Sequence, residues 1–267
     1  MSPLHLEIRG DGAPLVLLHG WGLNVRVWDA LAPTLEALRQ LVAVDLPGHG
    51  RSPWRPDGAG ASAQVEWIGR AVAEHIGRAP YALLGWSLGA QLALRWAAQP
   101  PAGLRPPAQL VLIAATPRFT AAQDWPYGTP ETRLLRMAEG LQSDYQQTVS
   151  EFLELQVRGS AAGEAVLEHL RAALFTHGEA VPEALTADLA LLRTTDLRGG
   201  LGGIDAPTLV VAGQYDRVVP PAASRALAAA MPHARLVEVH RGAHAPFLSH
   251  TAEVAALLAQ FLSSNIR

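Results

Sequence analysis

The chain has 267 residues, of which 49% are hydrophobic and 17% are charged, and its formal net charge is −3. This size allows a large hydrophobic core, and the charge balance lacks the basic excess that nucleic-acid binding requires. The sequence contains neither cysteine nor lysine, because all 21 basic residues are arginine. Disulfides, thiolate catalysis, Schiff-base chemistry and lysine-anchored cofactors are therefore excluded.

The N-terminal segment does not resemble a targeting signal. Residues 1–7 have no basic region followed by a long apolar stretch, and the sequence has no run of 18 apolar residues. We therefore expect a cytoplasmic protein that does not act at a membrane. The sequence also has no metal-ligand spacing and no nucleotide-binding glycine motif, so we expect no metal and no cofactor.

Short apolar runs alternate along the chain with longer segments of helical periodicity. The predicted strands are residues 4–9, 15–18, 41–45, 81–85, 109–114, 208–212 and 235–240. The predicted helices are residues 28–38, 64–76, 88–98, 222–231 and 252–262. Strands of this length separated by helices indicate an α/β fold, with a mostly parallel central sheet flanked by helices on both faces.

This alternation is interrupted between residues 117 and 195, where the sequence has helical periodicity and no convincing strand. Helices are expected over residues 131–140, 145–158 and 163–175. We interpret residues 117–195 as a helical lid inserted into a core formed by residues 1–116 and 196–267. The alternative is a set of peripheral helices with no role in access to the site.

The sequence GWSLG at residues 85–89 lies between a predicted strand and a predicted helix. A sharp strand–turn–helix needs small residues on both sides of its apex, because the apical backbone is strained. The helix that follows would place its N-terminus beneath the serine hydroxyl, where it stabilises negative charge. We interpret Ser87 as a nucleophile; the alternative is a surface serine in a glycine-rich turn.

A serine nucleophile needs a base, and the base needs an acid that orients it. Asp216 follows the predicted strand at residues 208–212, and open α/β sheets place their sites at the carboxyl ends of strands. Asp216 could instead be an ordinary turn or capping residue. Asp196 and Asp205 are rival candidates, but neither follows a strand. We therefore choose Asp216 as the acid.

The chain has ten histidines, so position must select the base. His244 follows the last predicted strand in a loop of small residues, which allows it to approach the serine. His250 is the nearest competitor, but it lies at the start of the last helix, where capping or packing is its expected role. His240 belongs to the predicted strand itself. We therefore choose His244 as the base.

An oxyanion hole needs two backbone N–H groups that point to the developing charge. One is expected from Leu88, the residue after the serine. The other is expected from Trp21 in the sequence HGWG at residues 19–22, which follows an early strand. The loop DLPGHGRS at residues 45–52 follows another strand, and we assign it a structural role in which His49 is not catalytic.

Ser87, Asp216 and His244, together with the HGWG and DLPGHGRS loops, resemble the α/β-hydrolase superfamily over nearly the whole chain. More closely, the chain resembles the carboxylesterases of the biotin pathway that cleave pimeloyl-acyl-carrier-protein methyl ester. The segments that carry this closer resemblance are HGWGLN (19–24), LGWSLG (84–89), DWP (124–126), QTV (147–149), FLELQ (152–156), TDLR (195–198) and AHAPF (243–247).

The resemblance implies an α/β-hydrolase fold and hydrolysis of a methyl ester through an acyl-enzyme on Ser87, with methanol leaving and no cofactor. It also implies a set of substrate contacts. These are Trp21, Ser87, Leu88, Phe152, Leu153, Glu154, Leu155, Gln156 and His244. The protein is expected to act as a monomer.

One feature departs from this family, which docks its acidic carrier protein on basic residues of the lid. Residues 117–195 contain six arginines and eleven acidic residues, a net charge of −5, and a like-charged surface slows association. A transient docking patch could still form from Arg133, Arg136, Arg158 and Arg171. The alternatives are a broad-specificity short-chain carboxylesterase acting on small free esters, a peptidase or C–C hydrolase with the same three residues, and a ligand-binding receptor on a hydrolase scaffold.

Overall fold

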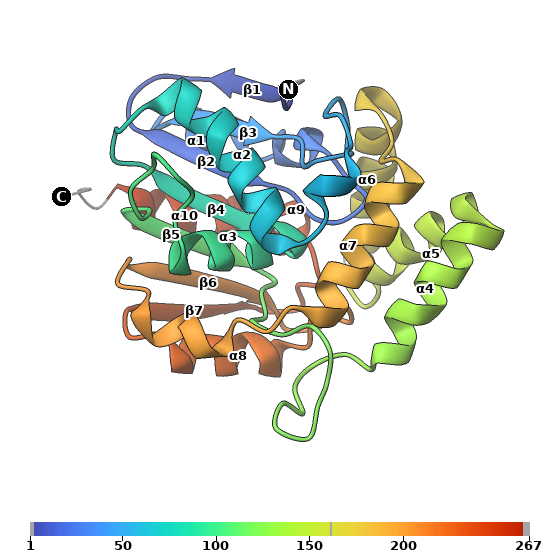
Figure 1. Ribbon diagram of the computed structural model, residues 1–267. Coiled ribbons are helices and arrows are strands. Elements are labelled where there is room, and N and C mark those ends of the chain that lie inside the picture. The colour runs from blue at the N-terminus through green and yellow to red at the C-terminus, as the bar shows by residue number, and fades with distance from the viewer. Residues whose placement is uncertain (1–2, 161, 264–267) are drawn as a thin grey trace.

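The computed structural model describes residues 3–160 and 162–263, and a single twisted sheet lies at its centre (Figure 1). Within these residues the sheet has seven strands in the order β1-β3-β2-β4-β5-β6-β7. The strands are β1 (Leu6–Arg9), β2 (Pro14–Leu18), β3 (Gln40–Val44), β4 (Ala82–Trp86), β5 (Gln109–Ile113), β6 (Thr208–Gly213) and β7 (Ala234–Val239). Strand β1 pairs antiparallel with β3, and the other pairs are parallel.

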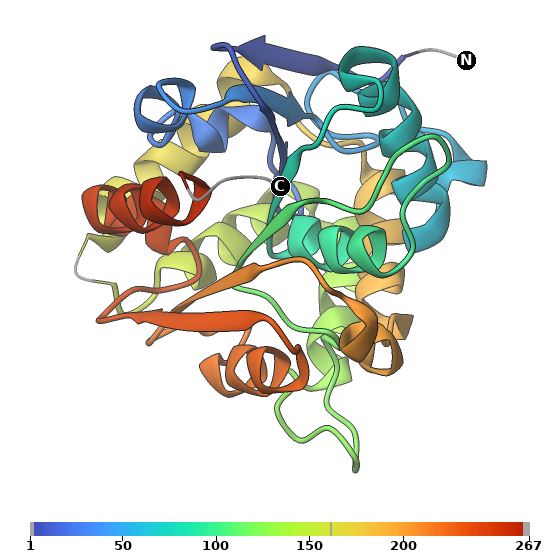
Figure 2. The ribbon, with the colours of Figure 1, turned by 90° about the vertical axis from the view of Figure 1, so that its left-hand side faces the viewer.

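Helices cover both faces of the sheet (Figure 2). One face carries α2 (Ala61–Ile76), α3 (Leu88–Ala98) and α8 (Pro221–Ala230), and the other carries α1 (Ala32–Glu36) and α10 (Thr251–Leu262). The central strands β2, β4, β5 and β6 are buried along their whole length, as expected for a parallel sheet covered on both sides. The predicted α/β class is therefore confirmed.

The helical insert, which we define as α4–α7, lies between β5 and β6 in the sequence. Its helices are α4 (Glu131–Ser143), α5 (Tyr145–Val157), α6 (Gly163–His177) and α7 (Pro182–Thr194). In Figure 1 it lies beyond the carboxyl ends of the parallel strands. No helix in the described part of the chain is long and apolar enough to cross a membrane. The boundaries of a functional lid stay a prediction.

The predicted strands agree with the structure to within two residues at each end. The predicted helix at residues 28–38 is too long, because α1 occupies only Ala32–Glu36 and a separate 3-10 turn (Val25–Trp28) precedes it. Pro33 lies in the first turn of α1, where its fixed φ is tolerated but its missing N–H prevents continuation from the preceding turn. Two further helices, α7 and the short α9 (Pro246–Ser249), were not predicted.

The turn between β4 and α3 is held by close contacts between backbones. A Cβ atom at Gly85 would lie 2.3 Å from the carbonyl oxygen of Gly89, and one at Gly89 would lie 2.2 Å from the carbonyl oxygen of Leu18. Real Cβ atoms do not approach other atoms this closely, so only glycine allows α3 to start directly against β2. This contact fixes the position of the residue at the apex of the turn.

We predict that Gly89→Ala lowers the free energy of unfolding by about 3 kcal/mol or more, because the carbonyl that the new methyl group meets belongs to a central strand and cannot move aside. The matched control is Gly199→Ala, where a Cβ would meet no atom within 4 Å. Denaturant unfolding of both variants tests this. Equal stability of the two variants would contradict the backbone-contact interpretation.

Candidate active site

Ser87 stands at the apex of the turn between β4 and α3. Its backbone has φ 57° and ψ −115°, a left-handed conformation that a residue with a side chain rarely adopts. Its N–H donates to the carbonyl oxygen of Ile113 on the neighbouring strand, with a distance of 3.0 Å. This anchoring holds the strained turn, and it leaves the hydroxyl above the N-terminus of α3.

The structure brings the three residues selected from the sequence into one hydrogen-bonded chain. The Ser87 hydroxyl lies 2.8 Å from Nε2 of His244, and Nδ1 of His244 lies 2.8 Å from Oδ2 of Asp216. Because the carboxylate accepts a hydrogen bond from Nδ1–H, the proton is held on Nδ1 and Nε2 is free to accept the proton of the serine. This is the arrangement that general-base activation of a serine requires.

Asp216 is oriented by the turn that follows β6. Its Oδ1 accepts the backbone N–H groups of Val218 at 2.8 Å and Val219 at 2.9 Å, which leaves Oδ2 for the histidine. The end of β6 also touches the histidine loop, because a Cβ at Gly213 would lie 2.0 Å from the carbonyl oxygen of Ala243. The acid and the base are thus positioned relative to each other by backbone contacts.

His244 is 1% exposed and is held by its own backbone from two sides. Its carbonyl oxygen accepts from the Trp86 indole N–H at 2.9 Å, and its N–H donates to the carbonyl oxygen of Gln156 at 3.0 Å. The first contact comes from the core and the second from α5 of the helical insert. The insert therefore helps to set the position of the candidate base.

The rival residues lie elsewhere. Asp196 forms ion pairs with Arg118 and Arg198 near the surface, and Asp205 is exposed at the amino end of β6. His240 lies one residue beyond the end of β7, so its predicted place inside the strand is wrong. His250 precedes α10, and its Nδ1 is 2.8 Å from the hydroxyl of Ser249, but its side chain does not cap the helix.

The loop predicted to supply an oxyanion donor is held by two buried histidines. His19 donates from Nδ1 to the carbonyl oxygen of Gly20 and accepts the N–H of Leu46 at Nε2. His49 accepts the N–H of Gly22 at Nε2, with a distance of 3.2 Å. Among the described residues, the amides of Trp21 and Leu88 have no hydrogen-bond acceptor, so both remain candidates for the oxyanion hole.

A small apolar cavity lies over Ser87. It is lined by Trp21, Ser87, Phe119, Arg133, Leu134, Met137, Phe152, Leu155, Leu189, Leu192 and Val218. Phe152 meets Trp21 edge to face, with 4.9 Å between ring centroids. Of the FLELQ segment, only Phe152 and Leu155 line this cavity. Leu153 and Gln156 are buried away from it, and Gln156 contributes its backbone carbonyl to the histidine instead.

Several lining residues were missed by the sequence analysis. Phe119 lies in the segment after β5, Val218 lies in the acid turn, and Leu189 and Leu192 belong to α7, the helix that was not predicted. The helical spacing of the two leucines was the only signal that could have indicated a face directed at the site.

The fold and the hydrogen-bonded serine, histidine and aspartate define an α/β hydrolase of the serine type. The chain belongs to the alpha/beta hydrolase family, whose profile matches residues 15–257. Over 262 residues it is 41% identical to the pimeloyl-[acyl-carrier protein] methyl ester esterase of Xanthomonas oryzae pv. oryzae (strain MAFF 311018), which covers 98% of this chain and 99% of that protein. The protein of the same name from Nitrosomonas europaea is 39% identical over 250 residues, covering 93% of this chain and 95% of the relative.

Solved structures agree with this family. The esterase EaEST from Exiguobacterium antarcticum superposes with a TM-score of 0.88 at 23% identity, covering 98% of this chain and 96% of that chain. At this identity the likeness demonstrates the shared fold alone. The α/β-hydrolase fold expected from the sequence motifs is thus confirmed, together with the closer resemblance to the methyl ester esterases.

We predict that Asp216→Asn lowers kcat on a p-nitrophenyl ester by about 10⁴-fold, because the neutral amide no longer stabilises the histidine tautomer and the imidazolium. KM should change little, since Asp216 does not line the cavity. Steady-state kinetics test this, with Ser87→Ala as the inactive baseline and Asp196→Asn as the control for a rival acid. Full activity of Asp216→Asn would remove it from the mechanism.

Proposed function

We propose that this protein is a serine carboxylesterase that hydrolyses the methyl ester of pimeloyl-acyl-carrier protein, the biotin-pathway step that the sequence motifs imply. The observation that carries the proposal is the hydrogen-bonded chain from Ser87 through His244 to Asp216 beneath an apolar cavity. The names of the relatives from Xanthomonas oryzae and Nitrosomonas europaea support the substrate. The site is formed within one chain, which supports action as a monomer. The names of the relatives, which give a substrate bound to acyl-carrier protein, support a place in the cytoplasm.

In the proposed reaction, the Ser87 oxygen attacks the carbonyl carbon of the methyl ester while His244 accepts the serine proton. The amides of Trp21 and Leu88 stabilise the negative oxygen of the tetrahedral intermediate. Collapse of this intermediate breaks the bond to methoxide, which takes the proton from His244 and leaves as methanol. Water, deprotonated by His244, then attacks the acyl-enzyme and releases the free carboxylate and the serine.

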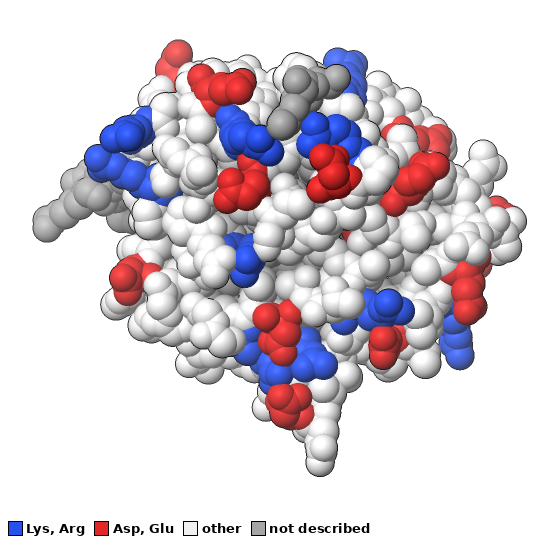
Figure 3. Space-filling model, in the orientation of Figure 1, with Lys and Arg blue, Asp and Glu red and all other residues white. Residues whose placement is uncertain are grey.

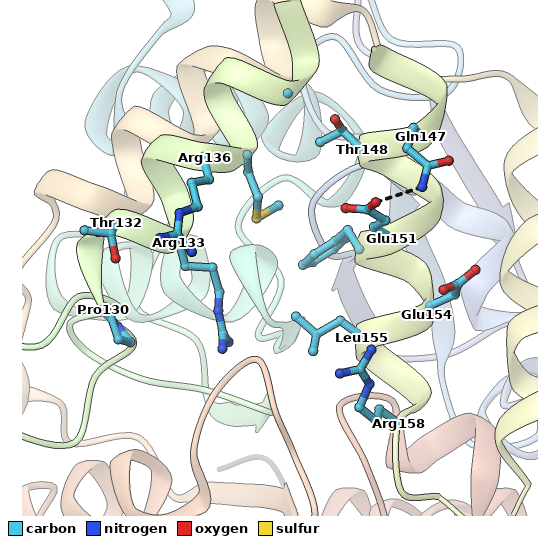
Figure 4. Close-up of a pocket in the computed structure, with 13 residues that line it drawn as sticks. Pro130, Thr132, Arg133, Arg136, Gln147, Thr148, Glu151, Glu154, Leu155 and Arg158 are labelled. Atoms are coloured by element: carbon cyan, nitrogen blue, oxygen red, sulfur yellow. Dashed lines mark hydrogen bonds between the residues drawn. The ribbon is translucent and has the colours of Figure 1, made fainter. Parts of the chain in front are cut away.

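The route to Ser87 fits an acyl chain that is tethered at its far end. A groove between α4 and α5 of about 680 Å³ opens on the surface (Figure 4). Arg133, Met137, Phe152 and Leu155 line both this groove and the apolar cavity. The methylene chain of a pimeloyl group would occupy the apolar part, while the carrier end would extend into the groove. This arrangement supports a substrate whose carrier remains outside.

The groove also bears on carrier docking. Arg133, Arg136 and Arg158 extend into it in Figure 4. Two acidic residues share the groove, but Glu151 accepts a hydrogen bond from Gln147 and Glu154 pairs with Arg171. We infer that these three arginines meet the acidic surface of the carrier.

The distribution of charge also supports a second substrate class, small free esters. On the face shown in Figure 3, acidic and basic side chains are interspersed, and residues 117–195 have a net charge of −5. Such a surface does not steer an acidic protein from a distance. A broad-specificity esterase that acts on small free esters is the second candidate, and the next two experiments separate it from the first.

We predict that the gene for this chain restores growth without biotin to a strain that lacks its own pimeloyl-carrier methyl ester hydrolase. The Ser87→Ala variant should not, because it cannot form the acyl-enzyme. Growth on biotin-free medium is the measurement, with expression checked for both. Absence of growth with a well-expressed enzyme that cleaves p-nitrophenyl esters would favour the free-ester candidate.

We predict that Arg136→Ala combined with Arg158→Ala lowers kcat/KM on the carrier-bound ester by roughly 10-fold or more, because charged contacts of the groove are lost. Turnover of a small free ester should stay within about 2-fold, since neither residue lines the inner cavity. Arg70→Ala is the matched control, because Arg70 is an exposed arginine on α2 and does not line the groove. Equal losses on both substrates would reject carrier docking at this groove.

A further inference from the structure

Helix α7 rests on the loops that surround the candidate oxyanion hole. The Trp21 indole donates to the carbonyl oxygen of Leu185 at 3.1 Å. At the start of the helix, the N–H of Val181 donates to the carbonyl oxygen of Gly48 at 2.9 Å. Val181, Leu185 and Asp188 are spaced so that they share one face of a helix. The part of α7 that contacts Trp21 through Leu185 therefore also places the carboxyl group of Asp188 beside the loop that contains His49.

His49 forms the support behind the oxyanion loop. It is fully buried, donates from Nδ1 to the carbonyl oxygen of Pro47 at 3.1 Å, and accepts the N–H of Gly22 at Nε2. Only the neutral tautomer with its proton on Nδ1 can make both bonds. Burial, reinforced by the neighbouring His19, lowers the pKa of His49 to about 3. The loop is thus held by an uncharged imidazole.

Asp188 lies next to this imidazole without a solvent contact. Its Oδ1 accepts from the side-chain amide of Gln64 on α2, and its Oδ2 lies 3.7 Å from Nε2 of His49. Oδ2 has no hydrogen-bond partner among the described residues. Burial raises the pKa of Asp188 to about 7, although the Gln64 hydrogen bond opposes this. The other titratable groups acting on His49 are His19 and Asp45.

We propose that Asp188 is a positioning residue for the oxyanion hole, because its protonation state selects the tautomer of His49. With the carboxyl protonated, His49 keeps its proton on Nδ1 and holds Gly22 through Nε2. When Asp188 ionises, its proton passes to Nε2 of His49 and the Nδ1 proton leaves to solvent, so one proton is lost in total and the imidazole stays neutral. The Nε2–H then donates to Oδ2 of the carboxylate, and Gly22 loses its acceptor.

Loss of the Gly22 hydrogen bond affects the neighbouring backbone amide of Trp21. Gly22 has φ +74°, and its N–H donates to His49 in one of two hydrogen bonds between the HGWG loop and the loop containing His49. The other, from the Leu46 N–H to His19, holds the start of the HGWG loop and does not reach the peptide that follows Trp21. Release of the Gly22 bond frees the peptide that follows Trp21, so the Trp21 amide is no longer held toward the reacting carbonyl. This inference rests on the proposed function, because it assigns the Trp21 amide to the oxyanion hole. Activity should therefore fall as Asp188 ionises.

The test compares kcat of wild type and Asp188→Asn on a p-nitrophenyl ester across the pH range. Asparagine has the same shape, can accept from Gln64 and cannot ionise. The ratio of variant to wild-type kcat should be near one at about pH 6 and rise about 10-fold by about pH 9, short of the ~10²–10³-fold cost of losing an oxyanion donor outright. KM should stay within about 2-fold, since Asp188 does not line the cavity. A ratio that does not change with pH would overturn the proposal.

A second background separates positioning through His49 from a direct effect of the Asp188 charge on the reaction. In His49→Phe, the imidazole that transmits the change is absent, so adding Asp188→Asn should leave the kcat ratio near one at every pH. A ratio that still rises with pH would mean that the carboxylate acts on the transition state directly, and the proposal would be wrong.

A measurement on the wild type needs neither turnover nor a folded variant of Asp188. The ¹⁵N shifts of the His49 ring, assigned by their absence in His49→Phe, should report a proton on Nδ1 at about pH 6 and on Nε2 at about pH 9. An unchanged tautomer would overturn the proposal. Because this readout is independent of catalysis, its failure is distinguishable from a failure of the proposed esterase function.

Discussion

The backbone contact between α3 and β2 at Gly89 determines where Ser87 stands. The carbonyl oxygen of Leu18 occupies the space that a side chain at this position would need, so the helix begins against the strand and the serine is lifted above it. A second contact of the same kind joins the end of β6 to the histidine loop through Gly213 and Ala243. The relative positions of nucleophile, acid and base are thus set mainly by the packing of main chains in a rigid, buried sheet.

The helical insert takes part in this arrangement as well as covering it. The carbonyl oxygen of Gln156 on α5 receives the N–H of His244, and the carbonyl oxygen of Leu185 on α7 receives the indole N–H of Trp21. A displacement of either helix would therefore remove a hydrogen bond from the candidate base or from the oxyanion loop. The position of the insert and the geometry of the site are therefore linked through these two hydrogen bonds.

The serine, the acid and the base of the candidate site could be predicted from the sequence alone. Ser87, Asp216 and His244 each come shortly after a strand, and parallel strands bring their carboxyl ends to one edge of the sheet. The resemblance to methyl ester esterases added the substrate class. Each of these signals lies within a short stretch of sequence, so it can be recognised without knowledge of the tertiary structure.

The supporting contacts and the lining of the cavity and groove could not be predicted, because they join residues far apart in the sequence. Gln64, Asp188 and His49 meet only because α7 packs across α2 and the loop after β3, and no spacing rule relates them. The FLELQ resemblance implied substrate contacts for all five residues 152–156, whereas Phe152 and Leu155 are the two that line the cavity. Which side chains of α5 face the cavity depends on how the helix packs, which the motif does not specify. Likewise the sequence offered Arg133, Arg136 and Arg158 as members of a possible docking patch, but it could not show that they line one groove. The net charge of residues 117–195 does not reveal this, because it ignores position and which acids are already paired.

The apolar lining of the cavity favours hydrolysis over the reverse reaction. A neutral methyl ester can enter a space lined by leucines, Phe119 and Phe152 at little cost. Hydrolysis converts it into a carboxylate, which has only the two backbone amides and His244 as polar neighbours, and burial of an ion with so few polar contacts is disfavoured relative to water. Arg133 is the only cationic side chain that lines this cavity in the described structure, and it lies where the cavity meets the groove. The product would therefore be expelled from the reacting position toward the groove, which opposes re-esterification and clears the site for the next ester.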